Sequence, residues 1–324
     1  MVGIGIVGTG GIAETHAECL SKIPDVRIAA TFDAVHEKAE GMASRYGATV
    51  CGDLDSVLAE VDAVYICTPP KFHREAAVRA AEAGVHVLCE KPLAAGLADA
   101  QAIEEAVTRA DITFMVGFHF RFTPALARLR ELVASGDLGE VYSFWGIRIL
   151  WSPHPAPNWR TDPRLLCGMT VESLSHDFDF MRWTAGEVAS VMGKVATSRA
   201  DLDGYDNIVS AIMNLEAGGI AQMHASWASH VPVHQYGVIG TRGSAVCEGG
   251  QVRWRAEPGS AESIIRCDRP EDQVSPYQRQ SEHFIACLRS GGQPLTGVQD
   301  GVATVRISHA VLESSQQSRV VTLS

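Results

Sequence analysis

The sequence lacks a long uncharged apolar run and an excess of basic residues. The longest stretch without Asp, Glu, Lys or Arg is residues 217–241, and it contains Gln222, His224, His230 and Gln235, so it is too polar to span a bilayer. With 27 basic against 38 acidic side chains, the formal net charge is −11. An acidic protein repels phosphate backbones. We therefore expect a protein that binds neither membranes nor nucleic acid.

Cysteine motifs and a secretory leader are also lacking. The eight cysteines, at positions 19, 51, 67, 89, 167, 247, 267 and 287, are scattered, and none forms a CxxC pair. We interpret them as small buried hydrophobes, and we expect no metal because no group of His, Cys and acidic residues has zinc-ligand spacing. The chain starts directly with an apolar run, without the basic region and cleavage site of a secretory signal. These features predict a cytoplasmic protein.

Length and composition are those of a globular protein with two domains. The 324 residues are enough for two hydrophobic cores at roughly 150 residues per domain. Hydrophobic residues make up 46% and charged residues 20% of the chain, which excludes a disordered or fibrous protein. We find no internal repeat or low-complexity tract.

The first part of the chain alternates short apolar runs with segments of helical periodicity. This alternation predicts a parallel sheet with helices on both faces, an α/β arrangement typical of a doubly wound, Rossmann-type nucleotide-binding domain over residues 1–117. The predicted strands are residues 2–7, 27–32, 63–67, 85–89 and 113–116, and the predicted helices are residues 11–23, 36–46, 73–83 and 98–110.

After Gly117 the pattern changes, because several strands between residues 188 and 256 follow one another without helices. Hairpin signals stand at residues 216–219, 241–243 and 249–250. Residues 118–324 are therefore predicted to form an α+β domain with a large, mostly antiparallel open sheet, which binds substrate and forms oligomers. The other predicted elements are helices at 124–135 and 171–184, a strand at 141–150, a Pro-, Trp- and His-rich loop at 151–164, and helices at 277–288 and 301–314 that return towards the first domain.

A glycine-rich turn joins the first predicted strand to the first predicted helix. Gly8 permits the tight turn, Gly10 lets the backbone approach a pyrophosphate, and Ala13 keeps the helix close to the sheet. At the helix start, the free N–H groups of residues such as Gly11 and Ile12 hold the negative charge. A glycine-rich turn alone is also common as a purely structural feature, so the dinucleotide prediction depends on a second signal.

That second signal is Asp33, which ends the second predicted strand 20 residues beyond Ala13. A carboxylate at this position accepts hydrogen bonds from both ribose hydroxyls of adenosine. It also repels a 2′-phosphate, which predicts NAD in preference to NADP. His36 and Lys38 lie close in sequence, and their charges would weaken this preference.

Two polar loops follow the predicted strands 63–67 and 85–89, at the carboxyl ends where open sheets bind ligands. They read Thr68-Pro69-Pro70-Lys71-Phe72-His73 and Glu90-Lys91-Pro92. With the glycine turn and Asp33, they make essentially the whole chain resemble the Gfo/Idh/MocA oxidoreductases. The resemblance implies cofactor contacts from Thr68, Pro69, His73, Glu90 and Lys91.

The family pattern implies that Lys91 reaches the nicotinamide edge and the reacting oxygen. An ammonium group at that point stabilises the alkoxide-like charge that develops as hydride leaves the carbon. For an arbitrary Glu-Lys pair, the alternative is a surface salt bridge between Glu90 and a basic residue. In relatives the Lys-Pro bond is usually cis, so we predict a cis bond between Lys91 and Pro92.

A second family motif is an acid followed four residues later by histidine, near the start of a helix in the second domain. Here Glu172 and His176 have this spacing, and on one continuous helix Asp179 would share their face. His176 is the natural base for the hydroxyl proton, because imidazole titrates near neutrality. Glu172 orients it or binds a sugar hydroxyl. A histidine among acids is alternatively a surface or packed core residue.

The chain departs from the family pattern at several positions. Many relatives have a glycine run at 166–168 and Asp in place of Glu172, so we expect a pocket that differs from that of inositol dehydrogenase. Residues 118–122 replace a motif of Asn followed by Arg-Arg-Phe. The further candidates implied by the resemblance are His119, Arg121, Asp179 and Tyr277 for the substrate, and Trp159 and Arg160 for the cofactor, with simple packing as the alternative for His119 and Trp159.

These motifs predict an enzyme that transfers hydride between NAD and a secondary carbinol or ketone of a sugar or cyclitol, with catalytic residues Lys91, His176 and Glu172. A reductase of keto-sugar nucleotides is an alternative with the same chemistry. A non-catalytic NAD-sensing regulator is an alternative of another class. A broad exposed sheet also predicts a homodimer or homotetramer.

Overall fold

The computed structural model describes residues 1–156 and 158–323, which divide into two compact units. Unit 1 consists of Met1–His119 and Ser275–Val305. Unit 2 consists of Phe120–Val274 and the described residues from Arg306 onward. The chain therefore leaves unit 1 twice, after His119 and after Val305, and the second crossing lies inside the helix α10 (Val298–Gln317).

Unit 1 contains a six-stranded parallel sheet in the order β3-β2-β1-β4-β5-β6. The strand order reverses between β1 and β4, because the chain first builds outward from β1 and then returns to its other side. In open α/β sheets the crevice at such a reversal, at the carboxyl ends of the strands, is where ligands bind. The strands are β1 (Val2–Val7), β2 (Val26–Phe32), β3 (Thr49–Val50), β4 (Ala63–Ile66), β5 (His86–Cys89) and β6 (Phe114–Val116).

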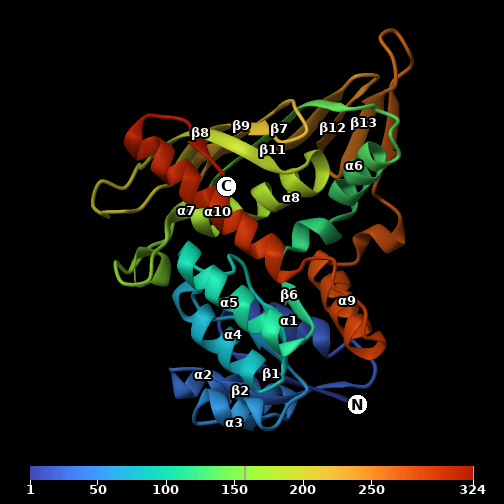
Figure 1. The fold of residues 1–324 in the computed structure, drawn as a ribbon. Coiled ribbons are helices and arrows are strands. Elements are labelled where there is room, and N and C mark those ends of the chain that lie inside the picture. Colours follow the sequence, from blue (N-terminus) through green and yellow to red (C-terminus); the bar gives the residue numbers. More distant parts are fainter. Residues whose placement is uncertain (157, 324) are drawn as a thin grey trace. The chain divides into compact units, whose positions relative to one another are not determined.

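Helices cover both faces of this sheet (Figure 1). In β4, Val64 and Ile66 belong to the core that includes α4 and α5, whereas the Tyr65 ring meets His16 of α1 and Phe284 of α9. The predicted doubly wound architecture is thus confirmed. The helices are α1 (Gly11–Leu20), α2 (His36–Tyr46), α3 (Leu54–Leu58), α4 (His73–Glu82), α5 (Leu97–Ala110) and α9 (Pro276–Ser290), with a 3₁₀ turn η1 (Pro70–Phe72) before α4.

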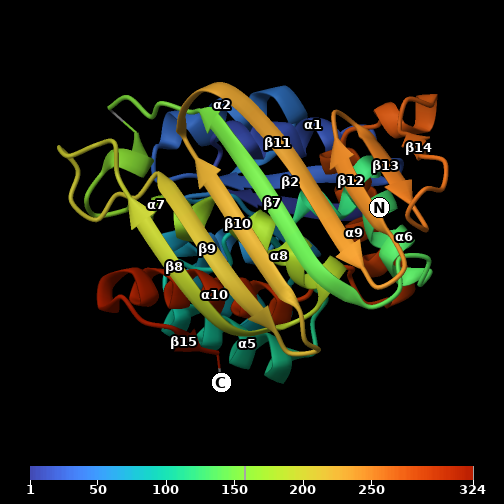
Figure 2. The ribbon, with the colours of Figure 1, turned by 90° about the horizontal axis from the view of Figure 1, so that it is seen from above.

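Unit 2 contains a nine-stranded sheet in the order β14-β13-β12-β11-β7-β10-β9-β8-β15, and Figure 2 shows its long strands side by side. Neighbouring strands are antiparallel except β7 and β10, which confirms the predicted open, mostly antiparallel sheet. The three predicted hairpins are also present. The strands are β7 (Val141–Trp151), β8 (Val188–Ala196), β9 (Ile208–Leu215), β10 (Ile220–Ser226), β11 (Ala228–Gly240), β12 (Ser244–Glu248), β13 (Gln251–Arg255), β14 (Ser263–Arg266) and β15 (Val321–Thr322).

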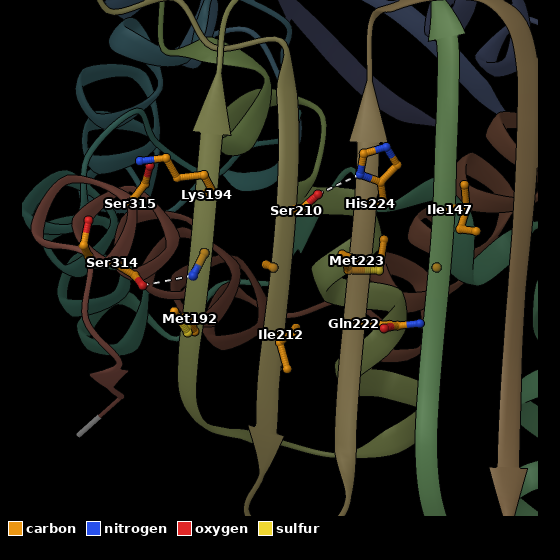
Figure 3. A pocket seen from close by; sticks show the side chains of 14 residues that line it. Ile147, Met192, Lys194, Ser210, Ile212, Gln222, Met223, His224, Ser314 and Ser315 are labelled. Atoms are coloured by element: carbon orange, nitrogen blue, oxygen red, sulfur yellow. Dashed lines mark hydrogen bonds between the residues drawn. The ribbon is translucent and has the colours of Figure 1, made fainter.

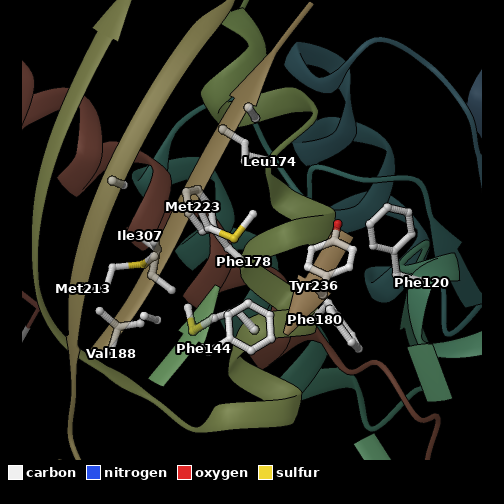
Figure 4. Close-up of a cluster of buried hydrophobic side chains, with 14 of the residues drawn as sticks. Phe120, Phe144, Leu174, Phe178, Phe180, Val188, Met213, Met223, Tyr236 and Ile307 are labelled. Carbon is white, nitrogen blue, oxygen red and sulfur yellow. The ribbon is translucent and has the colours of Figure 1, made fainter. Parts of the chain in front are cut away.

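One face of this sheet packs against helices and carries the core of unit 2 (Figure 4). Helix α10 lies close to β8, since a Cβ atom on Gly193 would be 2.8 Å from Val311 Cγ1, and Ser314 Oγ accepts a hydrogen bond from the Gly193 N–H (2.9 Å). The covering helices are α6 (Pro124–Ala134), α7 (Gly168–Glu172), α8 (Ser175–Ala185) and the end of α10, and the large core side chains include Phe144, Leu174, Phe178, Phe180, Met213, Met223 and Tyr236.

The prediction of one helix over residues 171–184 is wrong, because the helix breaks between α7 and α8. The guanidinium of Arg148 in β7 donates hydrogen bonds to the Ser173 carbonyl (2.9 Å) and hydroxyl (2.8 Å) at the break. This side chain occupies the carbonyl that a continuous helix would use. Glu172 and His176 consequently lie on different helices, α7 and α8.

In the part of the chain that the structure describes, no helix combines the length and apolarity that crossing a membrane would require.

Candidate functional site

The glycine turn of unit 1 has the geometry of a pyrophosphate cradle. Gly8 has a φ of +82°, and a Cβ atom there would lie 2.8 Å from the Thr68 backbone nitrogen, so only glycine fits. Cβ atoms on Gly10 and Gly11 would meet no described atom within 4 Å, which leaves the backbone open to a ligand. The start of α1 has no side-chain cap, so its first N–H groups remain available for an anion.

Asp33 is held against the same turn. Its Oδ2 accepts hydrogen bonds from the Thr9 backbone N–H (2.7 Å) and hydroxyl (3.1 Å), and its Oδ1 accepts one from the Val35 N–H (2.8 Å). A carboxylate oxygen has two lone-pair directions, so further acceptor capacity is left for ligand hydroxyls. These residues fit the adenosine and pyrophosphate parts of a dinucleotide.

His73 connects the two polar loops at the carboxyl ends of β4 and β5. Its ring is fully buried, with Nε2 2.8 Å from the Thr68 carbonyl oxygen and Nδ1 2.9 Å from the Pro92 carbonyl oxygen. The Lys91-Pro92 bond is cis, as predicted. The structure thus brings together Thr68, His73 and the Glu90-Lys91-Pro92 loop.

Glu90 accepts two hydrogen bonds below this loop. Its Oε1 lies 2.8 Å from Nε2 of the fully buried His16, and its Oε2 accepts a bond from the Lys91 backbone N–H (3.2 Å). Burial opposes ionisation, but the hydrogen bond and charge of His16, with the charges of Lys91 and His119, lower the pKa of Glu90 overall. A Cβ atom on Gly117 would lie 2.9 Å from Oε1, so the carboxylate also depends on a glycine in the next strand connection.

His16 is a site residue that the sequence reasoning missed. It lies three positions beyond Ala13, on the turn of α1 that faces the sheet, and a polar residue among buried alanines was the available signal. Its ring contacts Tyr277, with centroids 5.7 Å apart, and Tyr277 in turn packs on His119 (4.5 Å). The predicted residues His119 and Tyr277 therefore meet within unit 1.

His176 is buried in unit 2 near the start of α8. Its ring stacks on Phe120, with centroids 4.7 Å apart and an angle of 17° between the planes. The Arg148 guanidinium lies 5.9 Å from the centre of the same Phe120 ring. Packing thus orients the imidazole, and Phe120 contributes to the arrangement although the sequence reasoning did not select it.

The structure pairs Glu172 with Arg160. Arg160 Nε and Nη2 donate to the Glu172 carboxylate at 2.7 to 3.0 Å, and the guanidinium stacks 4.4 Å from the Trp159 ring centre. Glu172 is buried, whereas Arg160 is partly exposed. Three residues predicted for cofactor and substrate binding therefore form one group in unit 2.

Arg121 and Asp179, both predicted to bind substrate, bind each other. Arg121 donates to both carboxylate oxygens of Asp179, from Nε at 2.9 Å and from Nη2 at 2.6 Å, and its guanidinium lies 5.4 Å from the Trp183 ring centre. Both side chains are almost completely buried. Their role towards a substrate stays a prediction.

Comparisons with known proteins agree with this geometry. The model of the oxidoreductase family with an NAD-binding Rossmann fold, Gfo/Idh/MocA, matches residues 2–118, and the model of the C-terminal domain of the same family matches residues 126–246. The chain belongs to the Gfo/Idh/MocA family. The resemblance derived from the sequence motifs is thereby confirmed.

Relatives within this family match over almost the whole chain. Inositol 2-dehydrogenase of Rhizobium meliloti (strain 1021) is 28% identical and covers 99% of both chains. The scyllo-inositol 2-dehydrogenase (NAD(+)) of Bacillus subtilis (strain 168) is 27% identical over 98% of this chain and 95% of its own. A solved structure of levoglucosan dehydrogenase in complex with NADH and L-sorbose has the same fold, with a TM-score of 0.92 at 22% identity over 100% and 99% of the two chains.

The two donors that converge on Glu90 generate a test. A glutamine at this position offers one oxygen and one NH₂ group. In the Glu90→Gln variant, either two buried donors face one another, or the His16 ring changes tautomer and buries an Nδ1–H without an acceptor among the described residues. We expect this variant to lower the free energy of unfolding at pH 7 by about 1–3 kcal/mol. The Glu105→Gln variant is the control, because the pair between Glu105 and Arg109 is exposed. Urea unfolding measures both.

The pH dependence provides the second half of this test. Because the folded pKa of Glu90 is lowered, its stabilisation is present above the pKa of the unfolded chain and is lost as the pH falls through the folded value. The difference between the wild type and the variant should therefore shrink below about pH 4.5. Equal stability of the two glutamine variants at pH 7 would contradict the assignment.

Proposed function

We propose that this protein is an NAD-dependent dehydrogenase that oxidises a secondary carbinol of a sugar or cyclitol, or catalyses the reverse reduction. The observation that carries the proposal is the Glu90-Lys91-Pro92 loop on the same carboxyl edge of the sheet as the open Gly8–Gly11 turn. This arrangement offers a pyrophosphate cradle and an ammonium group on one sheet. The named inositol dehydrogenases among the relatives support the choice of substrate class.

Each site residue has a defined chemical task in this proposal. Oxidation of a CH–OH group releases a hydride and a proton, and the nicotinamide of a bound cofactor supplies the hydride acceptor. His176 takes the hydroxyl proton, and Lys91 stabilises the negative charge on the oxygen. Glu172, held by Arg160, accepts hydrogen bonds from a substrate hydroxyl and sets the orientation of the ring.

Removal of either reacting group tests the mechanism. We expect Lys91→Met and His176→Asn each to lower kcat by at least about 100-fold, because general base and oxyanion contributions are of this size. Binding of NADH, measured by fluorescence titration, should stay nearly intact. Lys22→Met is the control, since Lys22 pairs with Glu18 on the exposed side of α1. Full turnover of both site variants in a screen of sugars and cyclitols would refute the mechanism.

The preference for NAD over NADP rests on Asp33. Its carboxylate is fixed by three donors at the place where the adenosine ribose is expected, and a 2′-phosphate there would meet a like charge. The Asp33→Ser variant should lower the ratio of kcat/KM for NAD to that for NADP by at least about tenfold, since removing such a repulsion relaxes discrimination. A wild-type enzyme that prefers NADP would contradict the proposal.

The outer face of the unit 2 sheet supports a homodimer or homotetramer. Met192 and Ile212 are more than half exposed on β8 and β9, and they border a shallow cavity with Lys194 and with His224, whose Nδ1 lies 2.8 Å from Ser210 Oγ (Figure 3). Neighbouring apolar side chains exposed on one sheet face are typical of a surface that another subunit covers. A second copy of this chain is the partner we propose. A two-fold axis would place this face against the same face of the second copy, so apolar and polar groups would meet their own kind of surface.

Charge substitutions on this face test the assembly. The double variant Met192→Glu, Ile212→Glu should be monomeric at micromolar concentration in light scattering, because four glutamates would meet across a two-fold interface. Ile264→Glu is the control, since Ile264 is similarly exposed but lies on the strand β14 at the far edge of the sheet. A monomeric wild type would contradict the proposal.

A further inference from the structure

Unit 2 contains a second cavity, of about 290 Å³, that none of the site residues described above lines. It lies among three segments of the chain: the loop that follows β7, the connection between β8 and β9, and Trp227 between β10 and β11. Its size is at the lower end of the range for small-molecule sites, which suits a single ring.

Aromatic rings form the walls of this cavity, and they are held in place before any ligand arrives. Trp227 and Tyr205 are almost completely buried, with ring centroids 6.3 Å apart. The His154 ring stands edge-on to Trp227 (4.7 Å), and its Nδ1 lies 3.1 Å from the Tyr205 hydroxyl oxygen. The half-exposed Trp151 also lines the cavity, and its ring stacks on His230. Rigid rings of this kind bind a ligand with little loss of conformational entropy.

The cavity is electrically balanced. Arg199 lines it, but its guanidinium donates to both carboxylate oxygens of Asp201, at 2.8 and 2.7 Å. Two arginines that follow β7 also bind carboxylates: Arg160 binds Glu172, and Arg164 binds Asp162. A phosphate or diphosphate would need unneutralised cations here. The surroundings therefore favour a neutral ligand over a nucleotide sugar.

The same part of the chain also anchors the helix that carries Glu172. Tyr205 is followed by Asp206, whose Oδ2 accepts hydrogen bonds from the Thr170 N–H (2.9 Å) and hydroxyl (2.6 Å) in α7. A Cβ atom on Gly168 would overlap the Asp206 carboxylate, so the contact is close. Burial and the nearby charge of Glu172 both raise the pKa of Tyr205. The cavity wall is thus linked to the helix of Glu172 through Asp206 and Thr170, within one unit.

We propose that this cavity is a subsite for the second ring of a neutral, glycosidically linked substrate. The apolar C–H face of a pyranose packs on Trp151, the half-exposed aromatic ring of the lining, and its hydroxyl groups reach the polar rim formed by His154 and Ser152. The reacting ring then lies at Glu172 and His176. The proposal deepens the proposed function and rests on it, because it names the substrate as a disaccharide or glycoside rather than a free monosaccharide.

Paired substrates test the subsite in the protein loaded with cofactor. The probes are D-glucose, methyl β-D-glucoside, cellobiose, gentiobiose, maltose and lactose, each with NAD. We expect kcat/KM for at least one disaccharide to exceed that for the monosaccharide by at least about tenfold, since a second bound ring adds contacts of this size. Equal or lower values for every disaccharide would overturn the proposal.

Two variants locate the effect. Trp151→Ala and His154→Ala should each reduce the ratio of disaccharide to monosaccharide kcat/KM towards one. Tyr142→Ala is the matched control, because Tyr142 is an equally exposed aromatic residue at the opposite end of β7. Melting temperatures verify that all three variants fold. A disaccharide preference that survives unchanged in both cavity variants would place the second ring elsewhere and overturn the proposal.

A binding experiment separates failure of the subsite from failure of the proposed function. Saturation-transfer NMR with cellobiose and with D-glucose on the NADH-loaded protein reports binding without turnover. Suppose that the protein binds cellobiose, that Trp151→Ala weakens this binding, and that the protein oxidises no sugar. This result would support the subsite and contradict the proposed dehydrogenase activity. Oxidation of monosaccharides without binding of any disaccharide would support the dehydrogenase activity and contradict the subsite.

Discussion

The arrangement of unit 2 depends on one buried ion pair between strand β7 of its sheet and helix α8. Arg148 in β7 donates from Nε and Nη2 to both carboxylate oxygens of Asp177 in α8, and Tyr236 in β11 donates its hydroxyl to the same carboxylate (2.6 Å). Burial opposes the charge on Arg148, but Asp177 raises its pKa overall. Removing one partner would leave the other charged and buried, at a cost of about 3–5 kcal/mol.

This ion pair sets the local geometry of the candidate base. The same guanidinium donates to the carbonyl of Ser173, at the break between α7 and α8. His176 adjoins Asp177 in sequence, so fixing Asp177 against the sheet also fixes where the imidazole lies, against Phe120. A buried ion pair thereby orients a residue that is proposed to contact the substrate.

In unit 1, hydrogen bonds around the Glu90 carboxylate hold the loop of the candidate site in place. The backbone of the Lys91 loop and the ring of His16 both donate to Glu90, and His73 joins this loop to the one after β4. All strands of the parallel sheet point in the same direction, so the loops that follow them lie along one edge of the sheet. Rigid support from several elements is what a site needs when it must hold a reacting group within a fraction of an ångström.

Local patterns in the sequence were sufficient for much of the fold. The alternation of apolar runs and helical periods predicted the parallel sheet, and the Gly-rich turns predicted the hairpins of the second sheet. The two-residue strand β3 and the five-residue helix α3 were not predicted, because elements this short show no period. The four-residue spacing of Glu172 and His176 favoured one common helix, and this prediction was wrong. Arg148, whose guanidinium meets the break at Ser173, is 25 residues away in the chain.

Short motifs in the sequence define the chemistry that is available: the glycine turn, Asp33, the Glu-Lys-Pro loop and the Glu172 and His176 motif are all local. How these groups are held depends on the tertiary structure. His16 meets Glu90 across 74 residues, Arg121 is paired with Asp179 across 58, and the aromatic cavity joins three separate segments. Such pairings depend on packing between distant elements, which no periodicity within a short window records.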